Sequence, residues 1–253
     1  MKELNVIYED NHIIVVEKPV NIPSQADKTG DVDMLSIIKK YLKEKYNKPG
    51  DVYLGLIHRL DRPVGGVMVF AKTSKAAARL SEQVREKSFK KRYLVIVDGK
   101  MNKQSEILEN YLVKNERLNI SKVVQEGSKN AKCAKLDYEV LKYDKEINLS
   151  VLKINLHTGR HHQIRVQLSH CGHSIYGDQK YGTRGSGKQI CLWAYELTII
   201  HPTTKETMTF NILPQKNGSW KILEGINLWT NEKHIWNIEN DISYMFFNVS
   251  YKK

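Results

Sequence analysis

Apolar residues recur along most of this chain in short runs or at every second position, the pattern of β-strands. Turn residues such as Asp10-Asn11 and Asp98-Gly99 separate the runs. Residues 149–156 alternate apolar and polar side chains, as a strand with one buried face does. The strands predicted are residues 4–8, 12–17, 53–57, 67–71, 93–97, 107–113, 118–124, 136–141, 149–156, 190–200 and 206–213.

Three other segments carry apolar residues three and four positions apart, the spacing of a helix that packs on one face. The first runs from Met34 to Tyr46, with Asp33 as its N-cap and Pro49-Gly50 as its stop. The second is capped by Ser74, buries Ala76, Ala77, Leu80 and Val84, and turns Lys75, Arg79, Glu82, Gln83 and Arg85 toward solvent. The third begins near Arg160, with Ile164, Leu168 and Cys171 on its buried stripe.

Strands joined mainly by short turns, with about three helices, favour an α+β fold built on a largely antiparallel mixed β-sheet. We predict one domain over residues 1–216. Residues 217–253 form an aromatic, Asn-rich extension. This extension either packs on the domain or binds a partner, and we favour packing because exposed aromatic side chains are a liability in a soluble protein.

The composition is that of a globular protein, with 41% hydrophobic and 27% charged residues. The net charge is +12, and all of this excess lies in residues 1–216, because the extension carries four basic and four acidic residues. A basic folded domain suggests a polyanionic partner such as nucleic acid. A generally lysine-rich, solvated surface explains the same charge.

The three cysteines, Cys133, Cys171 and Cys191, are widely spaced and odd in number, which favours a reducing compartment over a disulfide framework. The first residues lack the basic and apolar regions of a signal peptide, and no apolar run reaches the length of a membrane span. We therefore expect a soluble, cytoplasmic protein, and a monomer.

The stretch His58-Arg59-Leu60-Asp61-Arg62-Pro63-Val64-Gly65-Gly66 lies between two predicted strands. Pro63 and the glycine pair predict a sharp turn, so that Asp61 lies on a loop between two buried strands. The flanking arginines favour the ionised form of Asp61, which suits a nucleophile or a charge stabiliser. On this local pattern alone, a structural ion pair that closes the turn fits slightly better than a reactive group.

A second stretch runs from Leu156 to Arg165 and contains Thr158-Gly159-Arg160-His161-His162-Gln163. A strand ends and a helix follows, so that backbone N–H groups and Arg160 could converge on a phosphate. Arg165 lies one turn into the helix and can point inward, where it needs a carboxylate partner such as Asp61. An amphipathic helix with a basic surface explains the pattern equally well.

Three further patterns carry less information. Residues 157–173 contain five histidines, but Gly159 interrupts His157 and His161, the pair with metal-ligand spacing, and we expect no metal. Residues 182–188 have P-loop spacing without the Mg²⁺-binding hydroxyl, and we predict a flexible basic loop. Lys90-Lys91-Arg92-Tyr93 could bind a nucleotide through its cations and ring, although a tyrosine packed in a sheet is more common.

Taken in order, these motifs resemble the RluA-like branch of the pseudouridine synthases. The resemblance covers about residues 5–214, and we expect no S4-type RNA-binding module in front of it. It departs at Val64-Gly65, where many members carry a Thr-Ser or similar pair, and at Trp193, where a histidine is common. The motifs that carry it are His58-Arg59-Leu60-Asp61, Gly66, Ala71-Lys72, Lys91-Arg92-Tyr93-Leu94, Gly99 and Thr158-Gly159-Arg160-His161-His162-Gln163-Ile164-Arg165, supported by Tyr8-Glu9-Asp10, Val15-Val16-Glu17-Lys18-Pro19, Gly177-Asp178, Tyr181-Gly182 and His201-Pro202.

The resemblance implies isomerisation of uridine to pseudouridine in RNA, without a metal or organic cofactor. Asp61 would be the reacting carboxylate, Arg165 its ion-pair partner, and Tyr93 the ring that stacks on the base. Arg59 would occupy the space left by the flipped nucleotide. The remaining substrate contacts implied are Arg62, Lys72, Arg160, His162 and Gln163.

Two other classes of function remain. An RNA-binding or ribosome-assembly factor could use the same fold without chemistry, but binding alone requires no Asp61, Tyr93 and Arg165 set. A nuclease or phosphotransferase normally needs clustered carboxylates for metal, and no other carboxylate stands near Asp61 in the sequence.

Overall fold

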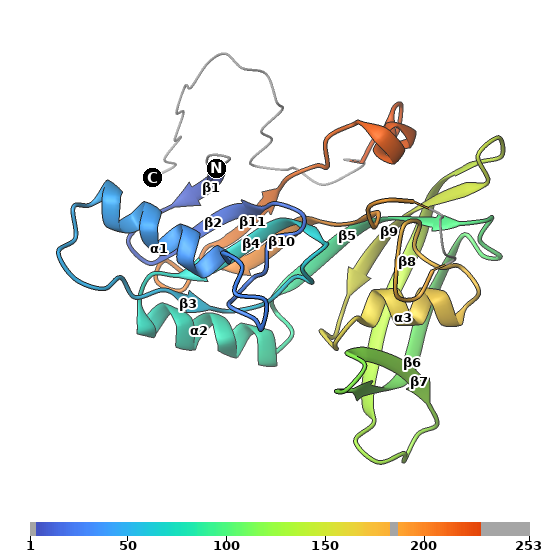
Figure 1. Cartoon of the computed structure of the whole chain (residues 1–253), viewed down its shortest axis with the longest axis horizontal. Coiled ribbons are helices and arrows are strands. Elements are labelled where there is room, and N and C mark those ends of the chain that lie inside the picture. The colour runs from blue at the N-terminus through green and yellow to red at the C-terminus, as the bar shows by residue number, and fades with distance from the viewer. Residues whose placement is uncertain (1–3, 183–186, 229–253) are drawn as a thin grey trace.

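The computed structural model describes residues 4–182 and 187–228, and its core is one mixed sheet of 11 strands (Figure 1). The strand order is β1-β2-β4-β10-β5-β9-β8-β6-β7, with β11 paired to β10 and β3 to β4. Only the β4–β10 pair is parallel among these strands. The strands are β1 Val6–Glu9, β2 Ile13–Lys18, β3 Gly55–Leu56, β4 Gly65–Ala71, β5 Lys90–Asp98, β6 Ser105–Asn115, β7 Ile120–Val124, β8 Lys132–Asp144, β9 Leu149–Leu156, β10 Leu192–Ile200 and β11 Thr207–Asn211.

Three helices cover the two faces of this sheet (Figure 1). α1 (Met34–Lys45) and α3 (Gln163–His170) contribute to the same core cluster, α1 over β2 and β4 and α3 over the strands beyond β5. α2 (Ser74–Arg85) packs on the opposite face against alternate residues of β2 and β4. Because both faces are covered, every residue of β4 is buried, which explains its continuous apolar run. The predicted α+β fold with a largely antiparallel mixed sheet is confirmed.

The first residues of the C-terminal extension pack on the sheet. A short 3₁₀ helix, η1 (Gly218–Leu223), buries Ile222 and Leu223 beside side chains of β5, β9 and β10. Lys142 donates a hydrogen bond from Nζ to the carbonyl of Ile222. The aromatic residues from Trp229 onward, and residues 183–186 of the predicted basic loop, lie outside the described residues.

Several local predictions were wrong, each for a visible reason. α2 is capped by Thr73, whose hydroxyl accepts from the Ala76 N–H, and not by Ser74. Gln83, predicted to face solvent, is buried because its amide pairs with both backbone groups of Ile200 on β10. α3 begins only at Gln163, since residues 158–162 form a turn, and Cys171 is exposed at its end.

The glycine pair does not form the turn before β4 as predicted. Gly65 and Gly66 are the first residues of β4, and the strand predicted at 53–57 shrinks to Gly55–Leu56. Within the part of the chain that the structure describes, all three cysteines are free, and no helix has the length and apolar character needed to cross a membrane.

Candidate active site

Asp61 lies on the loop between β3 and β4, and buried hydrogen bonds hold this loop in place. Lys18, at the end of β2, is fully buried and donates from Nζ to the carbonyls of Pro19, Arg62 and Val64 at 3.0, 3.1 and 2.6 Å. Burial lowers the pKa of Lys18 to about 7, and the charge of Asp61 opposes this effect. Ser24 exchanges hydrogen bonds with both backbone groups of Leu60. The backbone around Asp61 is therefore fixed, while its side chain stays 29% exposed.

Two residues at which the sequence departs from the pattern it resembles, Gly65 of the Val64-Gly65 pair and Trp193, are paired across β4 and β10. A Cβ added to Gly65 would stand 2.3 Å from Cζ3 of the Trp193 ring, so the ring occupies the space that a side chain would need. Trp193 also donates from Nε1 to the carbonyl of Ile212. The large ring on β10 thus requires glycine at the start of β4, and the two positions compensate each other sterically.

Exchanging this pair should reveal the compensation. Gly65→Ser overpacks the contact and should cost about 1–3 kcal/mol of unfolding free energy. Trp193→His empties part of the core and should cost about 3 kcal/mol. The double variant should cost at least about 1 kcal/mol less than the sum, as urea unfolding can measure. Gly50→Ser is the control, because nothing lies within 4 Å of its Cβ position. Strictly additive costs would contradict the compensation.

The guanidinium that contacts Asp61 comes from Arg165 on α3. Its Nη1 donates to Oδ2 of Asp61 at 3.1 Å, as the sequence had suggested. The other side of the guanidinium makes two parallel bonds of 2.7 Å to the fully buried carboxylate of Asp178. Burial opposes the charge, but the bonds to Asp178 and Asp61 raise the pKa of Arg165 above its usual value. Asp178 therefore orients Arg165, and Arg165 in turn orients Asp61.

The arginines beside Asp61 in sequence do not clasp it, contrary to the prediction. Arg62 points away and pairs with Asp31, with a further hydrogen bond to Thr29. Arg59 is exposed and makes no hydrogen bond or ion pair within the described residues. Consecutive residues of an extended loop point in different directions, so closeness in sequence did not bring the charges together.

His162 approaches the same carboxylate oxygen. It precedes α3 in the left-handed conformation, with φ of 53°, and its Nε2 lies 3.6 Å from Oδ2 of Asp61. Its Nδ1 lies 2.8 Å from the hydroxyl of Tyr181, whose ring also stacks under the Arg165 guanidinium at 5.2 Å. Burial lowers the pKa of His162 to about 3, so the imidazole is neutral near pH 7.

Tyr93 is buried on β5 in the core cluster that α3 covers. Burial raises the pKa of its hydroxyl, and the charge of Asp61 raises it further. The phenol is therefore protonated near neutral pH.

Three other predicted substrate contacts have structural partners. Lys72 lies at the far end of β4 from Asp61 and pairs with the buried carboxylate of Glu9 at 2.6 Å, so its predicted role is not supported. Gln163 ties the turn before α3, accepting from the Thr158 hydroxyl and the Arg160 N–H. Arg160 donates from Nε to the carbonyl of Cys133 and otherwise remains exposed.

Asp178 and Tyr181 were missed as site residues, although their motif was noticed. One signal could have found them: a buried guanidinium has five donors, and Asp61 alone satisfies few of them. A second carboxylate was therefore required. Asp178 also accepts from the N–H groups of Lys180 and Tyr181, which fixes the turn that presents the Tyr181 ring.

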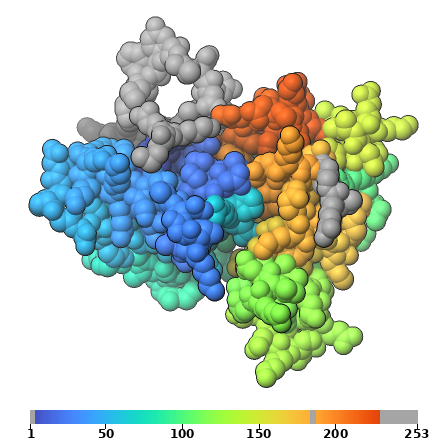
Figure 2. Space-filling view, in the orientation of Figure 1, coloured from blue at the N-terminus to red at the C-terminus, as the bar shows by residue number. Residues whose placement is uncertain are grey.

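The site lies where the N-terminal part of the molecule meets the part that carries α3. Figure 2 shows a hollow between these parts, bordered below by the β6–β7 hairpin. Within residues 4–182 and 187–228, no three His, Cys, Asp or Glu side chains gather in a way that could hold a metal ion.

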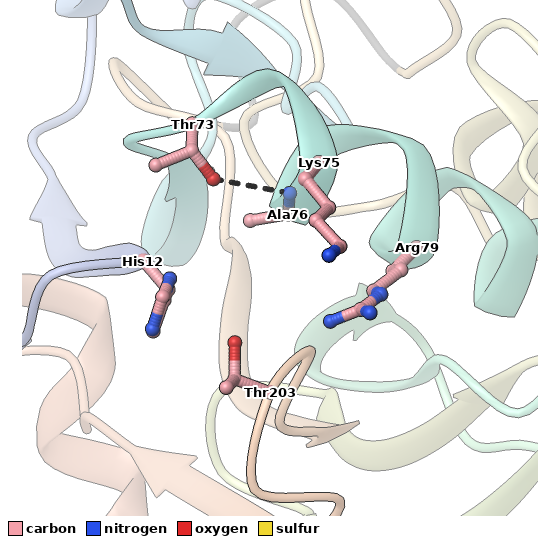
Figure 3. A pocket seen from close by; sticks show the side chains of 6 residues that line it. All are labelled: His12, Thr73, Lys75, Ala76, Arg79 and Thr203. Atoms are coloured by element: carbon pink, nitrogen blue, oxygen red, sulfur yellow. Dashed lines mark hydrogen bonds between the residues drawn. The ribbon is translucent and has the colours of Figure 1, made fainter.

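A separate hollow of about 400 Å³ lies at the other end of β4 (Figure 3). Lys75 and Arg79 of α2 line it on one side and His12 and Thr203 on the other, and no carboxylate is among the described residues that border it. It therefore lacks the reacting carboxylate that the Asp61 site offers.

Comparison with known proteins identifies relatives over most of the chain. Residues 12–170 match the RNA pseudouridylate synthase family. An uncharacterized RNA pseudouridine synthase of Aquifex aeolicus is 33% identical over 222 residues, which cover 83% of this chain and 69% of that protein. Ribosomal large subunit pseudouridine synthase C of Haemophilus influenzae is 30% identical over 217 residues, covering 83% and 65%. The chain thus spans about two thirds of the length of these relatives.

Solved structures agree on the fold. Human RNA pseudouridylate synthase domain containing 4 superposes with a TM-score of 0.70 at 21% identity, over 83% of this chain and 89% of that chain. Human RNA pseudouridylate synthase domain containing 1 gives 0.69 at 22% identity, over 87% and 86%.

Proposed function

This chain belongs to the RNA pseudouridylate synthase family, and we propose that it isomerises uridine to pseudouridine in a structured RNA with Asp61 as the reacting carboxylate. The reaction breaks the bond between C1′ and N1, turns the base, and joins C1′ to C5. C5 loses one proton and N1 gains one, so the reaction is balanced. Every step occurs on the nucleotide, and a single positioned carboxylate can supply the covalent or electrostatic help that it needs.

The observation that carries this proposal is the asymmetry of the Asp61 carboxylate. Arg165 and His162 both lie against Oδ2. Oδ1 accepts no hydrogen bond within the described residues, and the side chain is 29% exposed. One oxygen is thus held while the other is open to a nucleotide. Attack at C1′, attack at C6 and assistance of a glycal route are all compatible with this arrangement.

The remaining residues take roles around the flipped nucleotide. A base within an RNA helix cannot reach Asp61, so the target nucleotide must leave its stack. We propose that Arg59, which is exposed two residues before Asp61, occupies the vacated space. For Tyr93, buried on β5, we propose that the ring stacks on uracil and that the hydroxyl assists proton transfer at C5.

Release of tritium from RNA that contains uridine labelled at C5 tests the reaction directly, because C5 loses its hydrogen to water when it bonds to C1′. Catalytic release of tritium from labelled total RNA of a strain in which the gene is deleted supports the proposal. Tight binding without release would instead support a non-catalytic RNA-binding protein.

We propose ribosomal RNA as the first substrate to examine, since the Haemophilus influenzae relative carries a ribosomal large subunit name. Transfer RNA is the second, and we propose that the protein acts on either RNA in the cytoplasm. Pseudouridine maps of cells with and without the gene would identify the uridine. A map without any difference would exclude both RNAs as substrates under those growth conditions.

RNA binding should weaken steeply with salt. The net charge of +12 predicts several phosphate contacts, each of which releases counterions on binding. A plot of log Kd against log salt concentration should have a slope of about 2 to 3 or more, measured with a fluorescent transcript between about 50 and 200 mM salt. A flat plot would argue against RNA as the substrate.

A further inference from the structure

Tyr181 contacts both residues that lie beside Oδ2 of Asp61, and it makes no hydrogen bond to Asp61 within the described residues. Its hydroxyl lies 2.8 Å from Nδ1 of His162, and its ring lies under the guanidinium of Arg165. The same hydroxyl accepts a hydrogen bond of 2.7 Å from the backbone N–H of Ser121, on β7. This backbone donor comes from the β6–β7 hairpin, a different part of the sheet from the loop that carries Asp61.

The proton positions follow from this geometry. The Ser121 N–H can only donate, so it occupies one lone pair of the Tyr181 oxygen. The single hydroxyl proton of Tyr181 then has Nδ1 of His162 as its acceptor among the described residues. A neutral imidazole that accepts at Nδ1 carries its own proton at Nε2. That N–H lies 3.6 Å from Oδ2 of Asp61.

We propose that Tyr181 is a positioning residue that sets the Nε2–H tautomer of His162, so that His162 presents a donor and not a lone pair to Asp61. The opposite tautomer would place the Nε2 lone pair against the carboxylate, where the two would repel each other. With the donor in place, Oδ2 is flanked by Arg165 and His162, and Oδ1 stays open for the nucleotide. The consequence for turnover rests on the proposed function, whereas the tautomer itself does not.

One further contact holds the His162 ring in this orientation, and a second holds its neighbour His161. The ring of His161 stacks on it, with centroids 3.7 Å apart. Nδ1 of His161 lies 2.9 Å from the hydroxyl of Ser121, the residue whose backbone holds Tyr181. Burial is the main reason that the pKa of His162 is low, with Arg165, His161 and Lys180 acting in the same direction and Asp61 opposing them. The ring is therefore neutral near pH 7, and one of its two nitrogens carries a proton while the other is bare.

Nitrogen-15 NMR of the full chain, labelled at histidine, tests the tautomer without any substrate. The signals of His162 are identified as those that disappear in His162→Gln. In the wild-type spectrum they should show a bare Nδ1 and a protonated Nε2. These signals should not titrate between about pH 5 and 8. Tyr181→Phe should shift the Nδ1 signal toward the protonated value. A wild-type His162 protonated at Nδ1, or one unaffected by Tyr181→Phe, would overturn the proposal.

Turnover provides the second readout. Tyr181→Phe keeps the ring under Arg165 and removes only the hydroxyl that sets the His162 tautomer. We therefore expect kcat to fall roughly 10-fold with little change in KM. The amide of Gln places a donor near the Nε2 position without needing Tyr181, so Tyr181→Phe added to His162→Gln should have no further effect. Equal kcat losses in both backgrounds would mean that Tyr181 acts independently of His162.

Two control variants show whether the effect is specific to the hydroxyl of Tyr181. Tyr143→Phe removes another hydroxyl, one that bonds to Asn148 at an exposed site, and should change neither spectrum nor kcat. Ser121→Ala keeps the backbone donor to Tyr181, so it should preserve the His162 tautomer. If the wild-type protein releases no tritium, the proposed function fails while the NMR result still decides the tautomer.

Discussion

Asp61→Asn should eliminate tritium release from RNA while leaving the protein folded. Asn keeps the shape of the side chain but cannot attack carbon or carry the charge that the reaction needs, so kcat should fall at least roughly 10⁴-fold. The side chain is partly exposed, and Arg165 keeps both of its bonds to Asp178. The unfolding free energy should therefore change by no more than about 1 kcal/mol.

The matched control is Asp31→Asn, which removes an exposed carboxylate paired with Arg62 on the other side of the same loop. Its turnover should remain near that of the wild type. RNA affinity of Asp61→Asn, measured by fluorescence, should also remain within a few-fold. Tritium release at a tenth or more of the wild-type rate would remove Asp61 from its proposed role.

The sheet was predictable because burial of one face of a strand gives alternating apolar residues, and burial of both faces gives a continuous apolar run. β9 was predicted with its observed limits, because its alternation has no competing explanation. Capping and burial at single positions were less predictable. The apolar pattern could not distinguish Thr73 from Ser74 as a cap, nor show that the backbone of Ile200 would draw Gln83 into the interior. The burial of Gln83 depends on a strand 117 residues further along the chain, which a local pattern does not reveal.

The same reasoning separates what was foreseen in the site from what was not. The contact between Asp61 and Arg165 followed from the need of an inward arginine for a carboxylate and from the resemblance to the family. The support from Lys18 did not, because a lysine bound to backbone carbonyls has no signature in a sequence. The pairing of Lys72 with Glu9 did not either, because the two residues lie 63 positions apart in the sequence. Gly65 was interpreted as a turn residue, whereas it provides space for Trp193.

Arg165→Met should also abolish turnover, but it should damage the fold as well. The substitution leaves Asp178 fully buried without its counter-ion, which should cost about 3–5 kcal/mol of unfolding free energy. At the same time Asp61 loses the donor that fixes Oδ2. Loss of activity in this variant alone could therefore reflect either misfolding or misplacement of Asp61.

A second variant distinguishes these two causes. Arg165→Met combined with Asp178→Asn removes both buried charges, and the Asn oxygen can still accept from the Lys180 and Tyr181 N–H groups. Urea unfolding should show that this double variant recovers most of the lost stability, because replacing a buried ion pair by neutral groups is far less costly than leaving one charge alone. Tritium release should nevertheless stay at least roughly 10²-fold below wild type, since Asp61 still lacks its guanidinium.

Glu9→Gln serves as the control, because it breaks an ion pair with Lys72 at the other end of β4 from Asp61. This variant should lower stability without lowering kcat. If the double variant regains activity along with stability, Arg165 supports the fold and takes no part in holding the carboxylate for reaction.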